Sequence, residues 1–386
     1  MISVAEALEH VLALADPVGT EVVPLRSATG RVLAAPIIAR RAQPPFRASI
    51  MDGYAVSGDF PSYRVIGETP AGGVTIDRIA AGEAVRVFTG APVPDGATRV
   101  VIQEDVTRDG DMISLNSNAD AQLYIREIGR DFNVDDKIDG PRRLTPALVA
   151  LAASMNAPDL TVSRKPKVAL IATGNELVMP GETPAPSQII ASNSFALAAI
   201  AEAEGAEARM LPIARDTRES LEAAFALAAD ADLIVTIGGA SVGDYDLVGE
   251  VAGDLGLDRA FYKIAMRPGK PLMAGRIGKQ AMLGLPGNPV SSIVCGHIFL
   301  RPLLRAMQGL PKAAMPTQTA PLAEPVGANG PRQHYMRATL KDGALTIAER
   351  QDSALLTVLA DANALVVRPP QDTPKEAGDL VSFIEF

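Results

Sequence analysis

The chain of 386 residues has one cysteine and no tryptophan. A single cysteine cannot form an intramolecular disulfide or a thiolate metal site, which fits a reducing compartment and predicts a cytoplasmic protein. Aromatic residues make up only 4% of the chain, which argues against sites that stack bases or sugar rings. The 36 Lys and Arg residues are outnumbered by 45 Asp and Glu, so the net charge of -9 offers no positive field for nucleic acid.

Long apolar segments without interruption are also missing. Glu6 and Glu9 break the apolar start of the chain, and no basic segment precedes them, so no signal peptide is expected. The uncharged run at residues 281–300 is long enough to cross a membrane, but it contains Pro286 and Pro289. It therefore predicts a strand, a loop and a helix, and no membrane contact.

Hydrophobic residues make up 47% of the chain, enough to build several cores, and the residue pattern changes along the sequence. The expected domains are a discontinuous helical linker domain (1–36 and 141–165), an inserted β-rich domain (37–140), an α/β domain (166–312) and a small C-terminal β domain (313–386). We expect the first helix of the chain to pack with the helix at 145–156 across the insertion. Short β-type runs separated by Pro and Gly turns define the inserted domain.

Apolar runs alternate with helical patterns between residues 168 and 309, which predicts an α/β domain with an open parallel sheet. The expected strands are 168–172, 208–212, 233–237, 262–266 and 281–285, and the expected helices are 194–204, 218–229, 247–255 and 290–307. In such sheets ligands bind beyond the carboxyl ends of the strands. Candidate functional residues are therefore sought in the loops that follow these strands.

A glycine-rich loop follows the strand at 233–237. Gly238, Gly239, Ser241 and Gly243 can offer bare N–H groups to an oxyanion, although a tight turn alone would also favour glycine. Asp246 adds a carboxylate at the start of the next helix, where it would either compensate the helix dipole or bind a cation. Because acids beside a phosphate-binding loop repel an anion, the combination suggests phosphate bridged by Mg²⁺.

Lys263 and Arg267 are an even number of residues apart in a predicted strand, so both are expected on the same face. They would either form ion pairs with surface acids or hold an anionic ligand.

Two further acids are placed near the same sheet edge. Glu176 follows the first strand and is a candidate metal or ligand contact, and Asp216 is either the N-cap of a helix or a functional residue. The segment Pro286-Gly287-Asn288-Pro289 ends a strand and starts a helix, with Asn288 as the expected N-cap. The N–H groups of this segment are expected at the carboxyl edge of the sheet, where the other candidate loops also lie.

Six short segments follow one another in an order that is highly specific to one protein family. They are Met51-Asp52-Gly53-Tyr54-Ala55, Thr89-Gly90-Ala91-Pro92-Val93-Pro94, Thr173-Gly174-Asn175-Glu176-Leu177, Gly238-Gly239-Ala240-Ser241-Val242-Gly243-Asp244, Arg267-Pro268-Gly269-Lys270-Pro271 and Leu285-Pro286-Gly287-Asn288-Pro289-Val290-Ser291. With these motifs the chain resembles the molybdopterin molybdenumtransferase family, bacterial enzymes of molybdenum-cofactor assembly related to the C-terminal domain of gephyrin. The resemblance covers essentially the whole chain.

The resemblance implies an elongated homodimer of four-domain subunits, with the α/β domain of one subunit facing the β-rich domain of the other across the active-site cleft. It implies that molybdate and adenylylated molybdopterin yield molybdenum cofactor and AMP, with Mg²⁺ as the divalent cation. It also makes the molybdopterin adenylyltransferase and molybdoenzymes candidate protein partners.

Residue roles follow from the same resemblance. The implied catalytic residues are Glu176, Asp216, Asp246, Lys263, Arg267, Asp52 and Asp131, of which Glu176, Asp216 and Asp246 would bind the metal. The implied substrate-binding residues are Thr89, Arg126, Gly238, Gly239, Ser241, Gly243, Pro286, Gly287, Asn288, Pro289 and Ser353.

The chain departs from the family pattern at several positions. Arg47 and Arg130 stand where acids are common, Ile50 replaces a small residue, and Ala191 stands where an acid is frequent. The turn at 351–354 has the serine of the family pattern, Ser353, but lacks the glycines that flank it there. A non-catalytic pterin-binding or scaffolding relative is therefore an alternative function, and the molybdopterin adenylyltransferase reaction is another, because those enzymes share the α/β domain.

Overall fold

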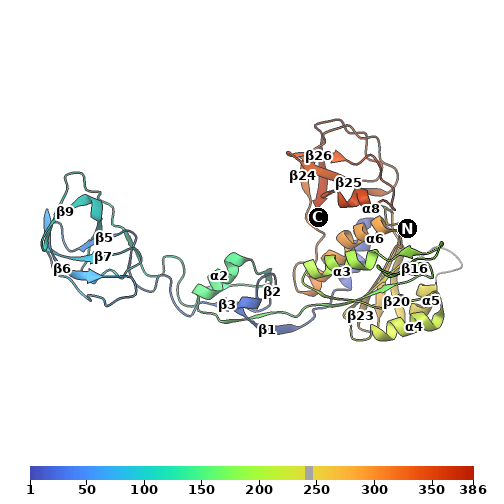
Figure 1. Cartoon of the computed structure of the whole chain (residues 1–386), viewed down its shortest axis with the longest axis horizontal. Helices are drawn as coiled ribbons and strands as arrows, with labels where there is room; N and C mark the ends of the chain where they lie inside the picture. The colour runs from blue at the N-terminus through green and yellow to red at the C-terminus, as the bar shows by residue number, and fades with distance from the viewer. Residues whose placement is uncertain (240–246) are drawn as a thin grey trace. The chain divides into compact units, whose positions relative to one another are not determined.

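The computed structural model describes residues 1–239 and 247–386. The described chain divides into two compact units, Met1–Glu21 with Ser163–Phe386, and Val22–Val162. Figure 1 shows the helices and strands of both units. The four-part division expected from the sequence stays a prediction.

The first unit contains a six-stranded sheet with the order β18-β15-β19-β23-β22-β20. Its strands are β15 (Lys167–Ala172), β18 (Glu207–Met210), β19 (Leu233–Ile237), β20 (Leu257–Lys263), β22 (Pro271–Ile277) and β23 (Gln280–Leu285). The strands β18, β15, β19 and β23 run parallel to one another. The strand β22 is antiparallel to both β23 and β20. The sheet is therefore mixed, and the expectation of a wholly parallel sheet is corrected.

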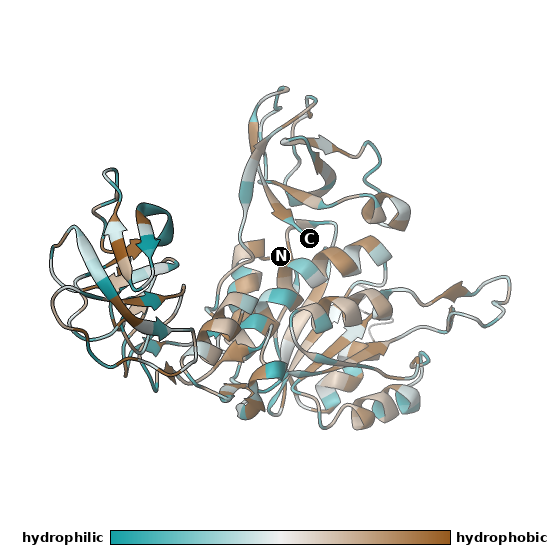
Figure 2. Ribbon diagram, turned by 60° about the vertical axis from the view of Figure 1, so that its left-hand side comes forward, coloured by the Kyte–Doolittle hydropathy of each residue, from teal (hydrophilic) through white to brown (hydrophobic). Residues whose placement is uncertain are grey.

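Helices cover both faces of this sheet, because alternate side chains of its central strands are apolar on each side. The helices are α1 (Val4–Ala13), α3 (Asn193–Ala203), α4 (Arg218–Leu227), α5 (Leu247–Asp254), α6 (Pro289–Cys295) and α7 (Arg301–Met307), with a π-helical turn at Gly296–Leu300 between the last two. One core joins α1, α3, α6 and α7 to the sheet, and a second joins α4 and α5 to its other face. Figure 2 shows hydrophobic colour along the central strands.

The strand expected at 262–266 does not form as one element. The strand β20 ends at Lys263, and the short strand β21 (Met266–Arg267) belongs to another sheet, where it pairs with β25 (Gln333–Lys341). Between them, Ile2 forms a bridge with Ile264. The N-terminal segment thus pairs with the residues that link the two strands.

The expected C-terminal β domain forms a six-stranded sheet with the order β21-β25-β27-β28-β24, in which β26 also pairs with β25. Its remaining elements are β24 (Gln318–Pro321), β26 (Ala344–Ile347), α8 (Leu356–Ala360), β27 (Ala364–Arg368) and β28 (Leu380–Glu385). Tyr335, Leu365 and Ile384 are buried in the same core as the α/β sheet. This domain is therefore packed onto the α/β domain.

The second unit is rich in short strands. They are β1 (Thr20–Pro24), β2 (Val32–Leu33), β3 (Ile37–Ile38), β4 (Ala48–Ser49), β5 (Gly53–Val56), β6 (Ser62–Thr69), β7 (Glu83–Val87), β8 (Arg99–Ile102), β9 (Val106–Asp109), β10 (Met112–Leu115), β11 (Ile125–Arg126), β12 (Lys137–Ile138), β13 (Arg142–Arg143) and β14 (Asp159–Ser163). The largest sheet has the order β8-β5-β7-β6-β10-β9. A four-stranded sheet, β1-β14-β2-β13, contributes to a separate core with the helix α2 (Pro146–Ser154).

The expectation that the first helix packs with the helix at 145–156 is wrong. Val4, Ala7 and Val11 of α1 are buried against the α/β sheet, whereas Ala152 of α2 is buried in a core of the second unit. The apolar stripe of α1 shows that the helix must be covered, but its 3.6-residue period carries no information about which element covers it.

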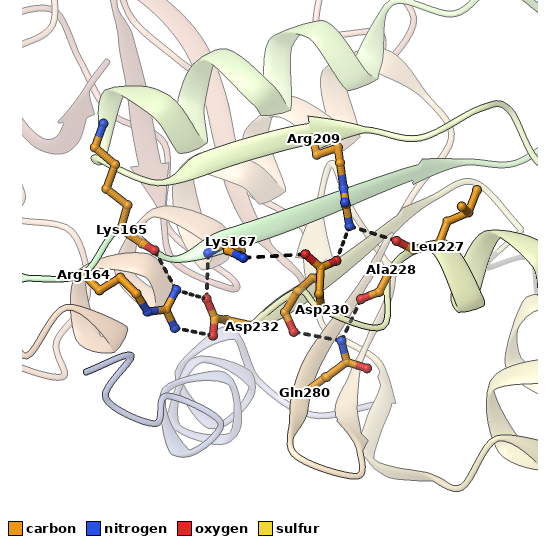
Figure 3. Close-up of polar contacts among 10 residues, drawn as sticks. Arg164, Lys165, Lys167, Arg209, Leu227, Ala228, Asp230, Asp232 and Gln280 are labelled. Atoms are coloured by element: carbon orange, nitrogen blue, oxygen red, sulfur yellow. Dashed lines mark hydrogen bonds and ion pairs between the residues drawn. The ribbon is translucent and has the colours of Figure 1, made fainter. Parts of the chain in front are cut away.

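Polar side chains connect the amino-terminal ends of the α/β strands (Figure 3). Arg164 donates two hydrogen bonds to the Asp232 carboxylate, at 3.0 and 2.8 Å, and a third to the carbonyl of Val18 at 2.8 Å. Asp232 also accepts from the backbone N–H of Lys167 at 2.7 Å. These bonds fasten the two chain segments next to the unit boundary to the sheet.

One helical run in the described residues, Pro289–Met307, is long and apolar enough to cross a membrane by length and composition alone. Within the protein 83% of its most apolar window is buried. It therefore packs as a core helix of the α/β domain.

Candidate functional site

A cavity of about 800 Å³ opens beyond the carboxyl ends of β15, β19 and β23. The chain passes from β15 through α3 to β18 on one side, and from β18 through α4 to β19 on the other, so the sheet order reverses at β15. Crevices form at such reversals because the loops after neighbouring strands diverge there. The volume lies in the range of small-molecule sites.

Eight residues predicted for the site line this cavity in the described chain, together with Ala191 and Asn193. The predicted residues are Glu176, Asp216, Gly238, Gly239, Pro286, Gly287, Asn288 and Pro289. The sequence thus placed the loops after β15, β19 and β23 correctly, because each follows a long buried strand.

Gly238 and Gly239 adopt a backbone that L side chains rarely adopt, with φ of +90° and +66°. A Cβ atom at Gly239 would lie 2.3 Å from the Val248 Cγ2 atom, and one at Gly238 would lie 2.9 Å from the carbonyl oxygen of Thr173. Both positions therefore require glycine for conformation and for close packing. The bare backbone leaves this wall of the cavity open to a ligand.

Glu176 and Asp216 are both exposed at the cavity. Asp216 Oδ2 accepts a hydrogen bond from the Asn175 N–H at 3.2 Å, and the Asp216 N–H donates to Asn175 Oδ1 at the same distance. The alternative role of Asp216 as an N-cap is wrong, since Thr217 caps α4 and accepts from the Ser220 N–H. Asp216 instead joins its own loop to the loop that carries Glu176.

The helix α6 begins beside the cavity, with Asn288 at the expected N-cap position. Its side chain makes no capping bond within the helix and instead donates to the Ser353 hydroxyl at 3.2 Å. The Ser353 carbonyl accepts from the Val290 N–H at 3.1 Å, and Ala354 lines the cavity. The turn at 351–354 of the C-terminal domain therefore lies against the start of α6.

Ser241, Gly243 and Asp246 lie outside the described residues. Their proposed roles stay predictions from the sequence.

Lys263 and Arg267 do not share one strand, although the sequence had predicted that they would. They belong to strands of different sheets, and neither is among the described residues that line the cavity. The Lys263 Nζ atom lies 5.8 Å from the centre of the Tyr262 ring. No ion pair between described residues includes either cation. The same-face argument fails because it assumed one continuous strand.

Arg267 instead belongs to a basic cluster around His334. Burial and the charges of Arg267, Arg337, Arg332 and Arg368 lower the pKa of His334 to about 4. The Arg337 side chain is almost fully buried and donates to the carbonyl of Asp352 at 2.7 Å. Arg337 therefore holds the turn that carries Ser353. The sequence analysis missed it because an isolated Arg in a strand gives no signal of such a contact.

In the second unit, Asp52 and Thr89 are directly bonded. The Asp52 carboxylate accepts from the Thr89 N–H at 2.7 Å and from its hydroxyl at 2.9 Å. These two bonds lower the pKa of Asp52, so the carboxylate stays ionised near neutral pH. The pair fastens the turn before β5 to the turn after β7.

A cavity of about 500 Å³ in the same unit is lined by Arg126, Arg130 and Asp131, and by Gly90 of the Thr89 motif. Two predicted site residues, Arg126 and Asp131, are thus brought together here. Arg130, one of the departures from the family pattern, lines this cavity as well. Arg47 forms a 3.4 Å ion pair with Glu127.

The described residues contain no group of three or more His, Cys, Asp or Glu side chains that could hold a metal ion. Glu176 and Asp216 nevertheless supply carboxylate oxygens at one cavity. Mg²⁺ in phosphate-binding sites typically takes one or two carboxylates and completes its shell with substrate phosphate and water. The donor set therefore fits Mg²⁺ together with a phosphorylated ligand.

Arg215 is a second residue that the sequence analysis missed. Its Nη1 atom lies 3.4 Å, 3.2 Å and 3.0 Å from the carbonyl oxygens of Gly174, Asn175 and Leu177. The only available signal was its position next to Asp216.

Three family regions match the chain in order. Residues 2–156 match the MoeA N-terminal region (domain I and II), residues 169–306 match a probable molybdopterin binding domain, and residues 319–386 match the MoeA C-terminal region (domain IV). A solved structure of a molybdopterin biosynthesis MoeA protein from Pyrococcus horikoshii is 30% identical, covers 100% of this chain and 99% of its own, and superposes with a TM-score of 0.83.

Curated relatives extend over nearly the whole chain. Molybdopterin molybdenumtransferase 2 of Mycobacterium tuberculosis is 35% identical, and the match covers 92% of each protein. The molybdopterin molybdenumtransferase of Haemophilus influenzae is 34% identical, and its match covers 96% of this chain and 95% of the relative. With the three regions in family order and relatives of this similarity, the chain belongs to the molybdopterin molybdenumtransferase family of transferases.

Proposed function

We propose that the chain inserts molybdenum from molybdate into adenylylated molybdopterin and releases AMP, giving molybdenum cofactor. The observation that carries the proposal is the cavity at the reversal of the α/β sheet. It combines exposed carboxylates of Glu176 and Asp216, the bare backbone of Gly238 and Gly239, and the start of α6. This is a surface suited to a phosphate-bearing ligand that is bound together with a cation.

In this proposal Glu176, Asp216 and Asp246 hold Mg²⁺, which would neutralise charge on the pyrophosphate of the substrate. The backbone N–H groups after β19 and at the start of α6 bind its oxygens. Ser353, whose hydroxyl accepts from Asn288 and whose neighbour Ala354 lines the cavity, would contact the substrate from the C-terminal domain. Lys263 and Arg267 hold oxyanion charge next to this site, with Arg267 in the basic cluster around His334.

Asp52, Thr89, Arg126 and Asp131 would complete the site from the second unit. We propose that they do so as a homodimer, in which this unit of one subunit meets the cavity of the other. The protein would act in the cytoplasm and receive its pterin from the adenylyltransferase before a molybdoenzyme takes the product. The cavity lined by Arg126 and Asp131 supports a ligand-binding role for the second unit.

An AMP-release assay tests the proposal. The purified chain is expected to release AMP from adenylylated molybdopterin only when molybdate and Mg²⁺ are both supplied, and Glu176→Gln is expected to lose most of this activity. Binding of the pterin without AMP release would identify a scaffolding relative. Formation of adenylylated molybdopterin from ATP and molybdopterin would identify an adenylyltransferase. Tungstate in place of molybdate measures the choice of oxyanion.

A further inference from the structure

The loop Gly174–Leu177, which carries Glu176, is held by an arginine that the proposed reaction does not use. The Arg215 Nη1 atom contacts the carbonyl oxygens of Gly174, Asn175 and Leu177, the closest at 3.0 Å. Among the ion pairs between described residues, none joins Arg215 to a carboxylate. Its positive charge is therefore directed at the backbone of this loop, and the Glu176 carboxylate remains available to a ligand.

The backbone on both sides of Arg215 is fixed to the same loop. The Gly174 N–H donates to the carbonyl of Ala214 at 3.1 Å, and the Arg215 N–H donates to the Ser220 hydroxyl at 2.9 Å. The Asp216 and Asn175 pair adds the two reciprocal bonds described above. Arg215 thus projects from a segment that is anchored to α4. The bonds fix the backbone position from which its guanidinium reaches the loop.

The conformation of the loop determines where the Glu176 carboxylate lies. Gly174 has φ of +145°, and a Cβ atom built there would lie 2.5 Å from Glu176 Oε2. The Glu176 side chain therefore folds back over Gly174, within a backbone whose carbonyls converge on Arg215. Without Arg215 the loop would keep the bond from the Ile189 N–H to the Glu176 carbonyl at 2.8 Å and the Asn175–Asp216 pair, but the carbonyls of residues 174, 175 and 177 would lose the donor that they share.

We propose that Arg215 is a positioning residue, which holds the Gly174–Leu177 loop so that Glu176 faces the cavity beside Asp216. This inference rests on the proposed function, in which both carboxylates bind the cation. Arg215 itself contacts neither substrate nor metal in this scheme. It acts by restricting the loop.

Mn²⁺ binding provides a readout that is independent of turnover. Mn²⁺, used as a substitute for Mg²⁺, is titrated into the full-length protein with AMP present, and bound Mn²⁺ is followed by electron paramagnetic resonance. Arg215→Gln is expected to weaken Mn²⁺ binding by about tenfold, the order of effect when a hydrogen-bonding charged group is removed. It is also expected to speed amide hydrogen exchange at Asn175.

Arg209→Gln is the matched control. Arg209 is also a surface arginine of the same domain, but it bonds the Leu227 carbonyl and Asp230, away from the cavity. This variant is expected to keep wild-type Mn²⁺ affinity and wild-type exchange at Asn175. An equal loss in both variants would show a general stability effect and overturn the proposal.

A double-mutant cycle with Glu176→Gln decides whether Arg215 acts through Glu176. If it does, Arg215→Gln has no further effect on Mn²⁺ binding in the Glu176→Gln background. Additive losses would overturn the positioning role. If Glu176→Gln weakens Mn²⁺ binding and Arg215→Gln does not, the positioning role fails and the proposed cation site stands. If Glu176→Gln leaves Mn²⁺ binding unchanged, the proposed cation site itself fails. Hydrogen exchange gives a separate result: an unchanged exchange rate at Asn175 in Arg215→Gln would exclude loop positioning by Arg215.

Discussion

At the scale of single residues, Asp52 and Glu176 are carboxylates held in opposite ways. Asp52 accepts two hydrogen bonds from Thr89 at its Oδ1 atom, and these lower its pKa and commit that oxygen to a neighbouring turn. Glu176 is exposed at the cavity and folds over a glycine. Asp52 is therefore suited to fixing the geometry of the second unit, whereas Glu176 has oxygens free for a cation.

Two buried histidines make the stability of the protein depend on pH. Burial lowers the pKa of His297 and of His334 to about 4 each. Because the unfolded chain takes up these protons near pH 6.5, it binds more protons than the folded chain between pH 6.5 and about 4. The free energy of unfolding is therefore expected to fall as pH is lowered through this window, by up to ~1.4 kcal/mol per pH unit for each histidine.

Denaturant unfolding between pH 7 and pH 5 checks this expectation, in a range where most carboxylates stay ionised. The double variant His297→Gln, His334→Gln is expected to lose stability at pH 7 and to show a much flatter pH dependence. The same slope in the variant and in the wild type would show that other groups produce the effect.

Two glycines at the cavity are expected to differ in their tolerance of alanine. Gly239 has a positive φ and a Cβ there would lie 2.3 Å from Val248, so Gly239→Ala is expected to lower the free energy of unfolding by about 1–3 kcal/mol. Among the described residues, a Cβ at Gly287 would meet only the Gly238 Cα atom, at 3.5 Å. Gly287→Ala is therefore expected to change stability by less than about 0.5 kcal/mol. Urea unfolding of both variants measures this, and equal losses would contradict the steric argument.

At the scale of elements, the sequence predicts best where one strand or helix is self-contained. The buried runs of β15 and β19 and the amphipathic pattern of α4 are long, regular and local signals. The strand at 262–266 was predicted wrongly because its residues join two different sheets, β20 pairing with β22 and β21 with β25. No local pattern reports that the end of the run pairs with a strand far along the chain.

The residues of the candidate site likewise divide into those that local sequence predicts and those that it does not. The glycines after β19 and the Asn288-Pro289 start of α6 can be predicted because backbone geometry selects those residue types. Arg215 was missed because its partners are backbone carbonyls, which every residue carries, and Arg337 because it bonds a backbone carbonyl and the Gln351 side chain in a turn that the sequence does not place beside it. An arginine that bonds carbonyls of a distant loop therefore leaves no trace in residue types or spacing.

The polar network at the amino-terminal ends of the strands allows a matched comparison of two acids (Figure 3). Asp232 receives two bonds from Arg164 and has 23% of its side chain exposed, whereas Asp230 is 56% exposed. Asp232→Asn is expected to reduce the free energy of unfolding by about 1–2 kcal/mol, and Asp230→Asn by no more than about 0.5 kcal/mol. Thermal and urea unfolding check both values, and equal effects would show that burial does not decide the contribution.

At the scale of the whole molecule, each compact unit carries its own cavity and its own part of the predicted site. Glu176 and Asp216 belong to the first unit, and Arg126 and Asp131 to the second. If the site is shared between subunits, a chain damaged in one unit can be complemented by a chain damaged in the other.

Mixed dimers test this sharing. Glu176→Ala and Arg126→Ala chains, each inactive alone, are allowed to exchange subunits, and half of the resulting dimers would contain one intact site of two. AMP release is expected to recover to about a quarter of the wild-type rate if exchange is random. A mixture of Glu176→Ala and Asp216→Ala is the control, because both changes damage the same unit. Equal recovery in both mixtures, or none in confirmed mixed dimers, would contradict a shared site.

The lone cysteine has a practical consequence for measuring how the first unit opens. Cys295 is fully buried in the core that joins the α/β sheet to the C-terminal domain, and burial raises the pKa of its thiol. A buried, protonated thiol reacts poorly with alkylating reagents. Labelling of the native protein should therefore proceed only through transient exposure of this core. Because the chain has no second thiol, the rate at which label accumulates reports the frequency of that single event, and ligands that bind the closed unit should slow it.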